Sequence, residues 1–398
     1  MAGLAALTLA YVMSQFYRSF LAVLTPALTS ELSASKAELS AASGAWFAAF
    51  ALAQFAVGVS LDRYGPKRTA SIMLALCGAG GAFLFASATT PWMITLAMAL
   101  IGVGCAPVLM ASVFIFARTY RPAQLAVLTS WLVAMGTAGN VIGAAPLAAA
   151  AEGFGWRGVI AALGVITLLI ALGIALFVRD PERVEHGDGA GLSGYLELLK
   201  IRALWFIIPL VALNYAPAAG IRGLWAGPYL ADVHGLDAIA IGNVTLFMAL
   251  AMVAGAFIYG PLDTFFGTRK WVAVAGNTLG LIAIALLALQ PAASLVQVTI
   301  LFVAIAIFGG SYGLLMAHGR AFLPAHLTGR GVTLLNFYSI GGVGAAQFAT
   351  GAVYSEYAVP GEPAAGYEAL FWFYAVTLAA AILIYLFSRD AKPERASE

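Results

Sequence analysis

Long apolar stretches separated by short polar loops run along the whole chain. Each of twelve windows reaches the length of roughly 20 mostly apolar residues that a helix needs to cross a bilayer. We therefore expect twelve transmembrane helices, near residues 4–28, 39–61, 69–88, 92–117, 124–149, 158–178, 204–230, 238–262, 271–289, 295–322, 331–354 and 367–387. The pattern predicts an all-α membrane protein.

The composition agrees with a polytopic membrane protein. Hydrophobic residues make up 62% of the 398 positions and charged residues only 10%, whereas soluble domains carry about 25% charged residues. The sequence has no GxxxxGK[ST] phosphate loop, and we find no nucleophile–base or metal-ligand constellation. We predict no enzymatic activity, no cofactor and no nucleic-acid partner. Cys77 and Cys105 have no metal-ligand spacing and are expected to be packing residues.

The longest polar interruption lies near the middle of the chain and suggests two halves. We expect a six-helix bundle over residues 1–178, a cytoplasmic linker over 179–202, a second six-helix bundle over 203–388 and a cytoplasmic tail over 389–398. If both termini are cytoplasmic, sixteen of the 20 Lys and Arg residues face the cytoplasm, and only Lys36 and Arg157 face outward. Because short cytoplasmic loops are enriched in Lys and Arg, we predict that both termini face the cytoplasm. We also expect the protein to lie in a bacterial inner membrane and to be a monomer.

Two landmarks recur in both halves at nearly the same spacing. Asp62 is followed by a glycine and a basic pair, and so is Asp263, which lies 201 residues later. Arg118 and Arg320 each precede a proline by four residues, and they are 202 residues apart. Internal duplication of this kind is typical of transporter folds.

The loop after the second expected helix resembles the signature of the major facilitator superfamily, G-x-x-x-D-R-x-G-x-x-R. The matching residues are Gly58, Asp62, Arg63, Gly65 and Arg68, with a degenerate copy at Asp263, Gly267, Arg269 and Lys270. The resemblance implies that gating residues include Asp62, Arg63, Gly65, Arg68, Arg118, Asp263, Arg269 and Arg320. In particular, it implies that Asp62 pairs with Arg118 on the cytoplasmic side and that the pair breaks as the two halves rock.

Two arginines fall in the middle of apolar segments, Arg18 on the first expected helix and Arg222 on the seventh. A cation at that depth costs about 2.5–3.5 kcal/mol on insertion scales. Every Asp and Glu lies in a loop or at a helix boundary, so no intramembrane carboxylate is available to pair with either arginine. We predict that an anionic ligand is the partner, against the alternative of structural hydrogen bonds to carbonyl groups.

By the same resemblance, expected helices 1, 4, 7 and 10 line a central cavity. The candidate substrate-binding residues are Tyr11, Gln15, Tyr17, Arg18, Asn140, Asn214, Tyr215, Arg222, Trp225, Asn336 and Tyr338. Pro217, Gly220 and Gly223 predict a kinked or partly unwound seventh helix. Tyr17-Arg18-x-Phe20, eight residues before Pro26, resembles the organophosphate:phosphate antiporters and the anion:cation symporters, but the subfamily stays unassigned.

The prediction is a secondary active transporter of a small organic or inorganic anion, working by anion exchange or by proton-coupled symport. Its expected partners are the anion, the lipid bilayer and, for symport, protons. His318 is the candidate proton carrier, and a hydrogen-bonded packing role is the alternative. Two rival functions remain: export of a neutral or amphiphilic metabolite or drug, and a non-transporting sensor or assembly factor on the same scaffold.

Overall fold

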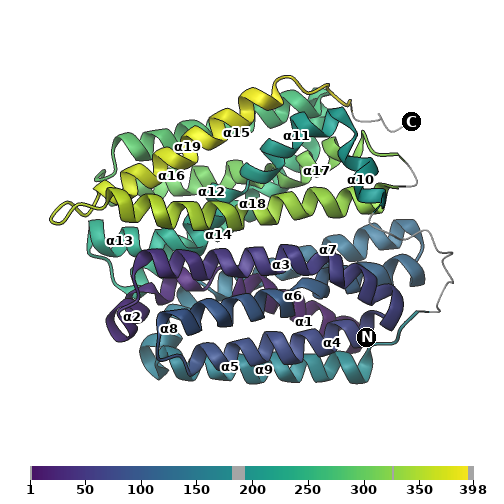
Figure 1. Cartoon of the computed structure of the whole chain (residues 1–398), viewed down its shortest axis with the longest axis horizontal. Coiled ribbons are helices and arrows are strands. Elements are labelled where there is room, and N and C mark those ends of the chain that lie inside the picture. The colour runs from purple at the N-terminus through teal and green to yellow at the C-terminus, as the bar shows by residue number, and fades with distance from the viewer. Residues whose placement is uncertain (1, 182–192, 325–326, 393–398) are drawn as a thin grey trace. The chain divides into compact units, whose positions relative to one another are not determined.

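The computed structural model describes residues 2–181, 193–324 and 327–392 (Figure 1). These residues are almost entirely helical, and their only paired extended backbone is an isolated bridge between Val359 and Glu362. The predicted all-α class is confirmed. Most of the expected linker and the end of the expected tail lie outside the described residues.

The N-terminal part of the chain forms the first ten helical elements. They are α1 (Ala2–Tyr17), α2 (Leu21–Leu32), α3 (Lys36–Tyr64), α4 (Pro66–Met73), η1 (Leu74–Ala79), α5 (Gly80–Ala86), α6 (Pro91–Thr119), α7 (Pro122–Ile142), α8 (Ala145–Phe154) and α9 (Trp156–Phe177).

The remainder forms twelve further elements. They are α10 (Ser193–Leu199), α11 (Arg202–Leu213), α12 (Ala216–Gly220), η2 (Ile221–Trp225), α13 (Ala226–His234), α14 (Ala238–Phe266), α15 (Arg269–Leu289), α16 (Leu295–Phe308), η3 (Gly309–Ser311), α17 (Tyr312–Arg320), α18 (Thr328–Tyr357) and α19 (Ala365–Tyr385).

These elements account for the twelve expected crossings. Within the described ranges, nine continuous helical runs are long and apolar enough to span a membrane. Two more crossings are bent helix pairs: α1 with α2 at 52°, and the end of α7 with α8 at 43°. The twelfth is α18, which has 30 residues and a more polar sequence. The chain therefore has the twelve-helix architecture that the sequence predicts.

The helices group into two compact units. The first unit contains Met1–Glu185 together with Arg222–Ala231 and Gly235–Leu246, and the second contains the rest. Within the first unit, glycines bring the segments 222–231 and 235–246 close to α2 and α8. A methyl group at Gly227 would overlap the Ala22 carbonyl oxygen, and one at Gly242 would lie 2.9 Å from the Ala145 Cα.

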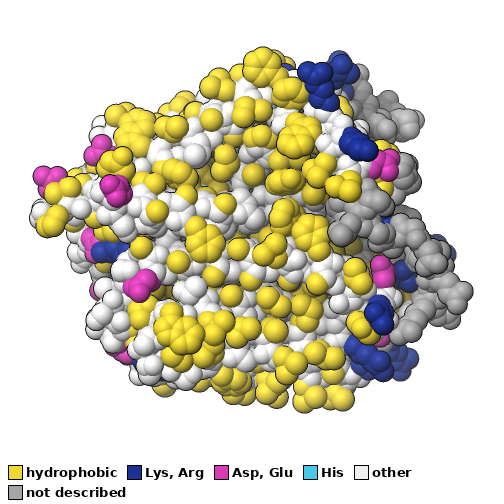
Figure 2. All heavy atoms as spheres, in the orientation of Figure 1, with side chains coloured by type: hydrophobic (Ala, Val, Ile, Leu, Met, Phe, Trp, Pro, Cys, Tyr) yellow, Lys and Arg dark blue, Asp and Glu magenta, His cyan; other side chains and the backbone are white. Residues whose placement is uncertain are grey.

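The surface is that of a membrane protein. Leu52, Leu76 and Phe257 expose 64%, 71% and 72% of their area, and hydrophobic side chains cover much of the visible face (Figure 2). Water would disfavour so much exposed apolar area, whereas lipid tails accept it. In each unit the visible Lys and Arg side chains gather mainly at one end of that unit (Figure 2).

Candidate functional site

The first transmembrane helix is interrupted at Arg18. α1 ends at Tyr17 and α2 begins at Leu21, with Arg18 and Ser19 in the turn between them. The first turn of α2 has no side-chain cap, so the positive end of its helix dipole is formed by free backbone N–H groups. Interrupted helices of this kind often form binding sites for charged ligands in transporters.

Two aromatic rings of α3 lie against the Arg18 guanidinium group. Its Cζ atom is 5.2 Å from the centre of the Trp46 ring and 5.5 Å from that of Phe50, within cation–π range. The two rings are four residues apart on the helix and stack on each other, with centroids 5.1 Å apart. The sequence analysis missed this aromatic pair, although the i, i+4 spacing places both rings on one helix face.

Arg18 has no anionic partner in the described part of the chain. It makes no ion pair or hydrogen bond there, and its Nε atom is buried without an acceptor. A buried donor left unsatisfied costs about 1–3 kcal/mol. The alternative of carbonyl pairing is therefore not what this structure shows for Arg18.

Arg222 lies in the π-helical turn η2 and is only 2% exposed. Its Nη2 atom donates a hydrogen bond to the Asn140 Oδ1 atom at 3.0 Å. The same oxygen accepts a hydrogen bond from Ser19 Oγ at 3.4 Å. The predicted irregularity of the seventh transmembrane helix is confirmed, because this helix is broken at residues 214–215 and again becomes irregular in η2.

Glycines on α7 let this helix approach the first transmembrane helix closely. A methyl group at Gly136 would overlap the Tyr11 ring, and one at Gly139 would overlap the Val12 carbonyl oxygen. Small residues at helix interfaces permit such backbone contact. As a result, Asn140 reaches the turn that carries Arg18.

Four of the other candidate residues in the first unit are buried. Tyr17 is fully buried and its hydroxyl lies 3.0 Å from Thr167 Oγ1, inside the bundle. Trp225 is also fully buried. Both side chains therefore pack inside the first unit in this structure, and their expected role as substrate ligands stays a prediction. Gln15 donates to the Tyr11 hydroxyl at 2.9 Å, and both of these side chains lie below 10% exposure.

In the second unit, Asn214 belongs to a buried amide network. Asn214 Nδ2 donates to Ser311 Oγ at 3.1 Å, and Asn277 Nδ2 donates to the same hydroxyl at 3.1 Å. Asn214 is 3% exposed. In this structure its amide takes part in interhelical hydrogen bonding, and its role as a substrate ligand stays a prediction.

The other second-unit candidates separate into two places. Tyr215 lies 6.4 Å from the ring of Tyr312, whose hydroxyl donates to Asn336 Oδ1 at 2.8 Å. These three side chains are half-buried. Tyr338 instead packs against the hydrophobic cluster of Leu198, Leu327 and Leu334, and its role as a substrate ligand stays a prediction.

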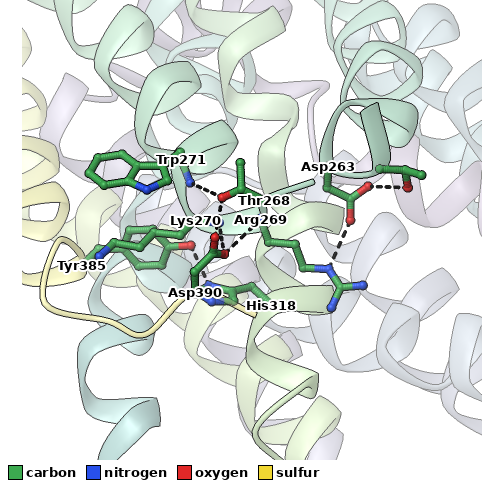
Figure 3. A network of polar contacts seen from close by, with 9 residues as sticks. Asp263, Thr268, Arg269, Lys270, Trp271, His318, Tyr385 and Asp390 are labelled. Atoms are coloured by element: carbon green, nitrogen blue, oxygen red, sulfur yellow. Dashed lines mark hydrogen bonds and ion pairs between the residues drawn. The ribbon is translucent and has the colours of Figure 1, made fainter. Parts of the chain in front are cut away.

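The signature loop and its repeat differ in their ion pairs. In the repeat, Arg269 Nε donates to Asp263 Oδ2 at 3.1 Å (Figure 3). In the first copy, Asp62 is exposed and makes no hydrogen bond or ion pair with any described residue. The guanidinium group of Arg118 lies over Phe114 at 4.3 Å. The expected Asp62–Arg118 pair is therefore not formed in this structure.

The remaining predicted gating residues are mostly exposed. Arg63 lies over the Tyr64 ring at 5.3 Å, and the side chains of Arg68 and Arg320 face outward. Gly65 has a φ of +86° at the C-terminal end of α3, a conformation that glycine adopts without strain. Their roles in gating stay predictions.

A carboxylate that the sequence analysis missed caps the helix after each copy of the loop. Asp180 Oδ1 accepts a hydrogen bond from the Lys67 backbone N–H at 2.7 Å. Asp390 accepts from Thr268 Oγ1 at 2.6 Å and from the Lys270 backbone N–H at 3.0 Å (Figure 3). Both aspartates follow an arginine just after the sixth helix of their half, and this repeated Arg-Asp pair was the available signal.

The pKa of Asp390 reflects this arrangement. Burial raises the pKa, but hydrogen bonds from Thr268 and from the backbone N–H groups of Lys270 and Arg269 outweigh it and lower the pKa below the ordinary value of 3.8. Hydrogen bonds to an ionised carboxylate favour that charged form. Asp390 is therefore an anion at the positive end of α15, where it stabilises the helix.

His318 is fully buried and both of its ring nitrogens have partners. Nε2 lies 2.9 Å from the Arg389 carbonyl oxygen and Nδ1 lies 2.6 Å from the Tyr385 hydroxyl (Figure 3). Because a carbonyl oxygen only accepts, the proton is on Nε2 and Nδ1 accepts from Tyr385. This geometry favours the packing alternative for His318 over proton transfer.

Several known solved structures have the same fold. A bacterial homolog to the human lysosomal transporter Spinster, in an inward-facing and occupied conformation, superposes with a TM-score of 0.78 at 19% identity over 97% of this chain and 96% of that one. The nucleoside transporter NupG gives 0.74 at 16% identity over 97% and 98%. The xylose transporter XylE from E. coli gives 0.72 at 13% identity over 98% and 97%.

Sequence comparison agrees with the fold. The "Probable L-galactonate transporter" of Escherichia coli (strain K12) is 24% identical over 278 residues, which cover 63% of this chain and 58% of the relative. The match thus spans less than two thirds of that relative. The profile of the Major Facilitator Superfamily matches residues 7–221, more than half of the chain. The chain belongs to the Major Facilitator Superfamily.

Proposed function

We propose that this protein is a secondary transporter of a small organic anion, in which Arg18 binds the negative charge of the substrate. The observation that carries the proposal is the environment of Arg18. Arg18 lies at a break in the first expected membrane-spanning helix, its guanidinium group lies against two aromatic rings, and no described carboxylate pairs with it. A cation in that position is typical of ligand or ion pathways.

The shape of the Arg18 site favours a carboxylate. The Trp46 and Phe50 rings lie close to the guanidinium carbon, so a ligand approaches from the remaining sides of the group. Arginine donors match the two oxygens of a carboxylate as a bidentate pair. The curated relative is named for L-galactonate, which is also a carboxylate, and this name supports the same class of substrate.

Two coupling mechanisms fit a site of this charge. In anion exchange, one anion leaves as another enters, and the cost of an unpaired buried cation disfavours the return of the empty site. In symport, a proton crosses on the acidic group of the substrate. His318 takes no part in either mechanism, because its two ring nitrogens are hydrogen-bonded to the Arg389 carbonyl oxygen and the Tyr385 hydroxyl.

The test is binding and uptake by purified protein. Native protein should be stabilised in thermal-shift assays by D-gluconate, and reconstituted vesicles should accumulate radiolabelled gluconate. Arg18→Gln should abolish both signals. The matched control is Arg202→Gln, which removes the same charge from an exposed position at the start of α11.

The outcomes separate the rival functions. Equal gluconate binding by native protein and Arg18→Gln would overturn the anion site. Saturable binding without any flux would favour a sensor. Uptake or release of neutral metabolites that Arg18→Gln leaves unchanged would favour the exporter.

A further inference from the structure

One side-chain oxygen, Asn140 Oδ1, connects the turn between α1 and α2 with the Arg222 end of η2, and all three positions belong to the first unit. It accepts a hydrogen bond from Arg222 Nη2 at 3.0 Å and another from Ser19 Oγ at 3.4 Å. A flipped amide would point its own N–H groups at the guanidinium N–H groups of Arg222, which only donate. The orientation of the Asn140 amide is therefore fixed by its partners.

The nitrogen atom of the same amide, Asn140 Nδ2, has a different environment from Oδ1. Asn140 Nδ2 makes no hydrogen bond with the residues that the structure describes, and the Asn140 side chain is half-buried. Arg222, by contrast, is 2% exposed. The more accessible donor at this position is therefore the Asn140 amide group, because the Arg222 side chain is buried.

We propose that Asn140 Nδ2 donates a hydrogen bond to the substrate and that Arg222 is a positioning residue, which fixes the Asn140 amide. The inference rests on the proposed function, because Arg18 supplies the second point of contact. Ser19, the next residue after Arg18, donates to the same Asn140 oxygen, so the Asn140 amide lies beside the turn that carries Arg18. The assignment reverses the sequence-based expectation that Arg222 itself binds the anion.

This arrangement specifies the class of substrate. Arg18 offers charge to one carboxylate, while a neutral amide N–H offers a hydrogen bond to an uncharged oxygen. A site that contacts a hydroxyl or carbonyl oxygen in this way rejects analogues that lack it, because its own polar group is left unpaired. The expected substrate is a monocarboxylate with a hydroxyl or keto group, and it should bind more tightly than a dianion such as a sugar phosphate, because the Asn140 amide adds no second positive charge.

The decisive variant is Asn140→Asp. Aspartate keeps an acceptor oxygen for Arg222 and Ser19, so the folded protein should be at least as heat-stable as the native one. It replaces the donor with an anionic oxygen, so gluconate affinity should fall by tenfold or more. A purely structural Asn140 would tolerate this change, because its bond with Arg222 becomes charge-assisted. Gln290→Glu, at an exposed position, is the matched control for the added charge.

A pair of probes tests the donor directly. Native protein should bind D-gluconate at least tenfold more tightly than hexanoate, which lacks every hydroxyl, and Asn140→Ala should remove most of this preference. Arg222→Lys cannot hold the amide as a planar guanidinium does, so it should weaken gluconate more than hexanoate.

The outcomes distinguish this inference from the proposed function. Native-like gluconate binding by Asn140→Asp, or an unchanged gluconate preference in Asn140→Ala, overturns the inference while Arg18-dependent binding stands. Tighter binding of glucose 6-phosphate than of gluconate by native protein also overturns it. Loss of affinity in Asn140→Asp with native thermal stability supports it.

Discussion

Gly227 packs directly on the carbonyl group of Ala22, so closely that a methyl group at Gly227 would overlap the carbonyl oxygen. Pro26, four residues after Ala22, has no N–H to bond that carbonyl within α2. Gly223, one turn before Gly227, is also close to the first helix: a methyl group at Gly223 would lie 3.2 Å from the Arg18 carbonyl oxygen. The seventh transmembrane helix thus meets the interrupted first helix backbone to backbone, next to the Arg18 site.

Gly227→Ala should disrupt this contact. The added methyl group must displace backbone, because the atom that it meets is a carbonyl oxygen and not a flexible side chain. Overpacking of this kind costs about 1–3 kcal/mol, so we expect a lower melting temperature and weaker gluconate binding. Gly158→Ala on α9 is the control, since nothing lies within 4 Å of its Cβ position. Equal thermal stability of both variants would contradict the close packing.

Asp390→Asn should destabilise the second unit. Asparagine still accepts a hydrogen bond but lacks the negative charge that interacts favourably with the positive end of the α15 dipole. We therefore expect the free energy of unfolding to fall by about 0.5–1 kcal/mol. The measurement is thermal unfolding in detergent, followed by intrinsic fluorescence. Asp180→Asn should have a similar effect in the first unit, because Asp180 accepts from the start of α4 in the same way.

The pH dependence has a definite sign. The folded pKa of Asp390 lies below the ordinary value of 3.8, so its stabilising contribution is complete above that value. The contribution is lost as the pH falls through the lowered folded pKa. The stability difference between native protein and Asp390→Asn should therefore shrink below about pH 4. A difference that grows on acidification would contradict the assignment.

The sequence predicts the architecture better than the site. Apolar length alone locates the crossings, because the bilayer requires it, and the duplicated loop indicates the family. Membrane depth likewise marks Arg18 and Arg222, since intramembrane cations are rare.

Side-chain direction is what the sequence could not provide. Tyr17 and Arg18 are adjacent, yet Tyr17 faces Thr167 within the bundle while Arg18 faces the rings of α3. The helix break after Tyr17 changes the direction of successive side chains, so the spacing of a regular helix does not give the side-chain directions across it. Asp180 and Asp390 were missed for a different reason: most of their partners are backbone N–H groups, so the repeated Arg-Asp pair was the only mark that they left in the sequence.

Trp46→Leu should weaken anion binding without abolishing it. The ring lies 5.2 Å from the Arg18 guanidinium carbon, and a cation–π contact of this kind contributes about 0.5–2 kcal/mol. We expect gluconate affinity to fall about twofold to thirtyfold by this range. Trp46→Phe keeps an aromatic ring and should retain most of the affinity. Calorimetry with both variants distinguishes the aromatic contribution from a general packing defect, which would lower the affinity of both equally.

His318→Phe should destabilise the protein and leave coupling unchanged. Phenylalanine fills much of the volume but removes the acceptor for the buried Tyr385 hydroxyl and the donor to the Arg389 carbonyl. An unsatisfied buried polar group costs about 1–3 kcal/mol, so the melting temperature should fall clearly. The measurement that separates packing from proton transfer is gluconate-driven proton flux in vesicles, normalised to the amount of folded protein. If His318 only packs, the ratio of proton flux to gluconate flux stays native. A ratio that drops to zero while gluconate still crosses would show that His318 carries the proton.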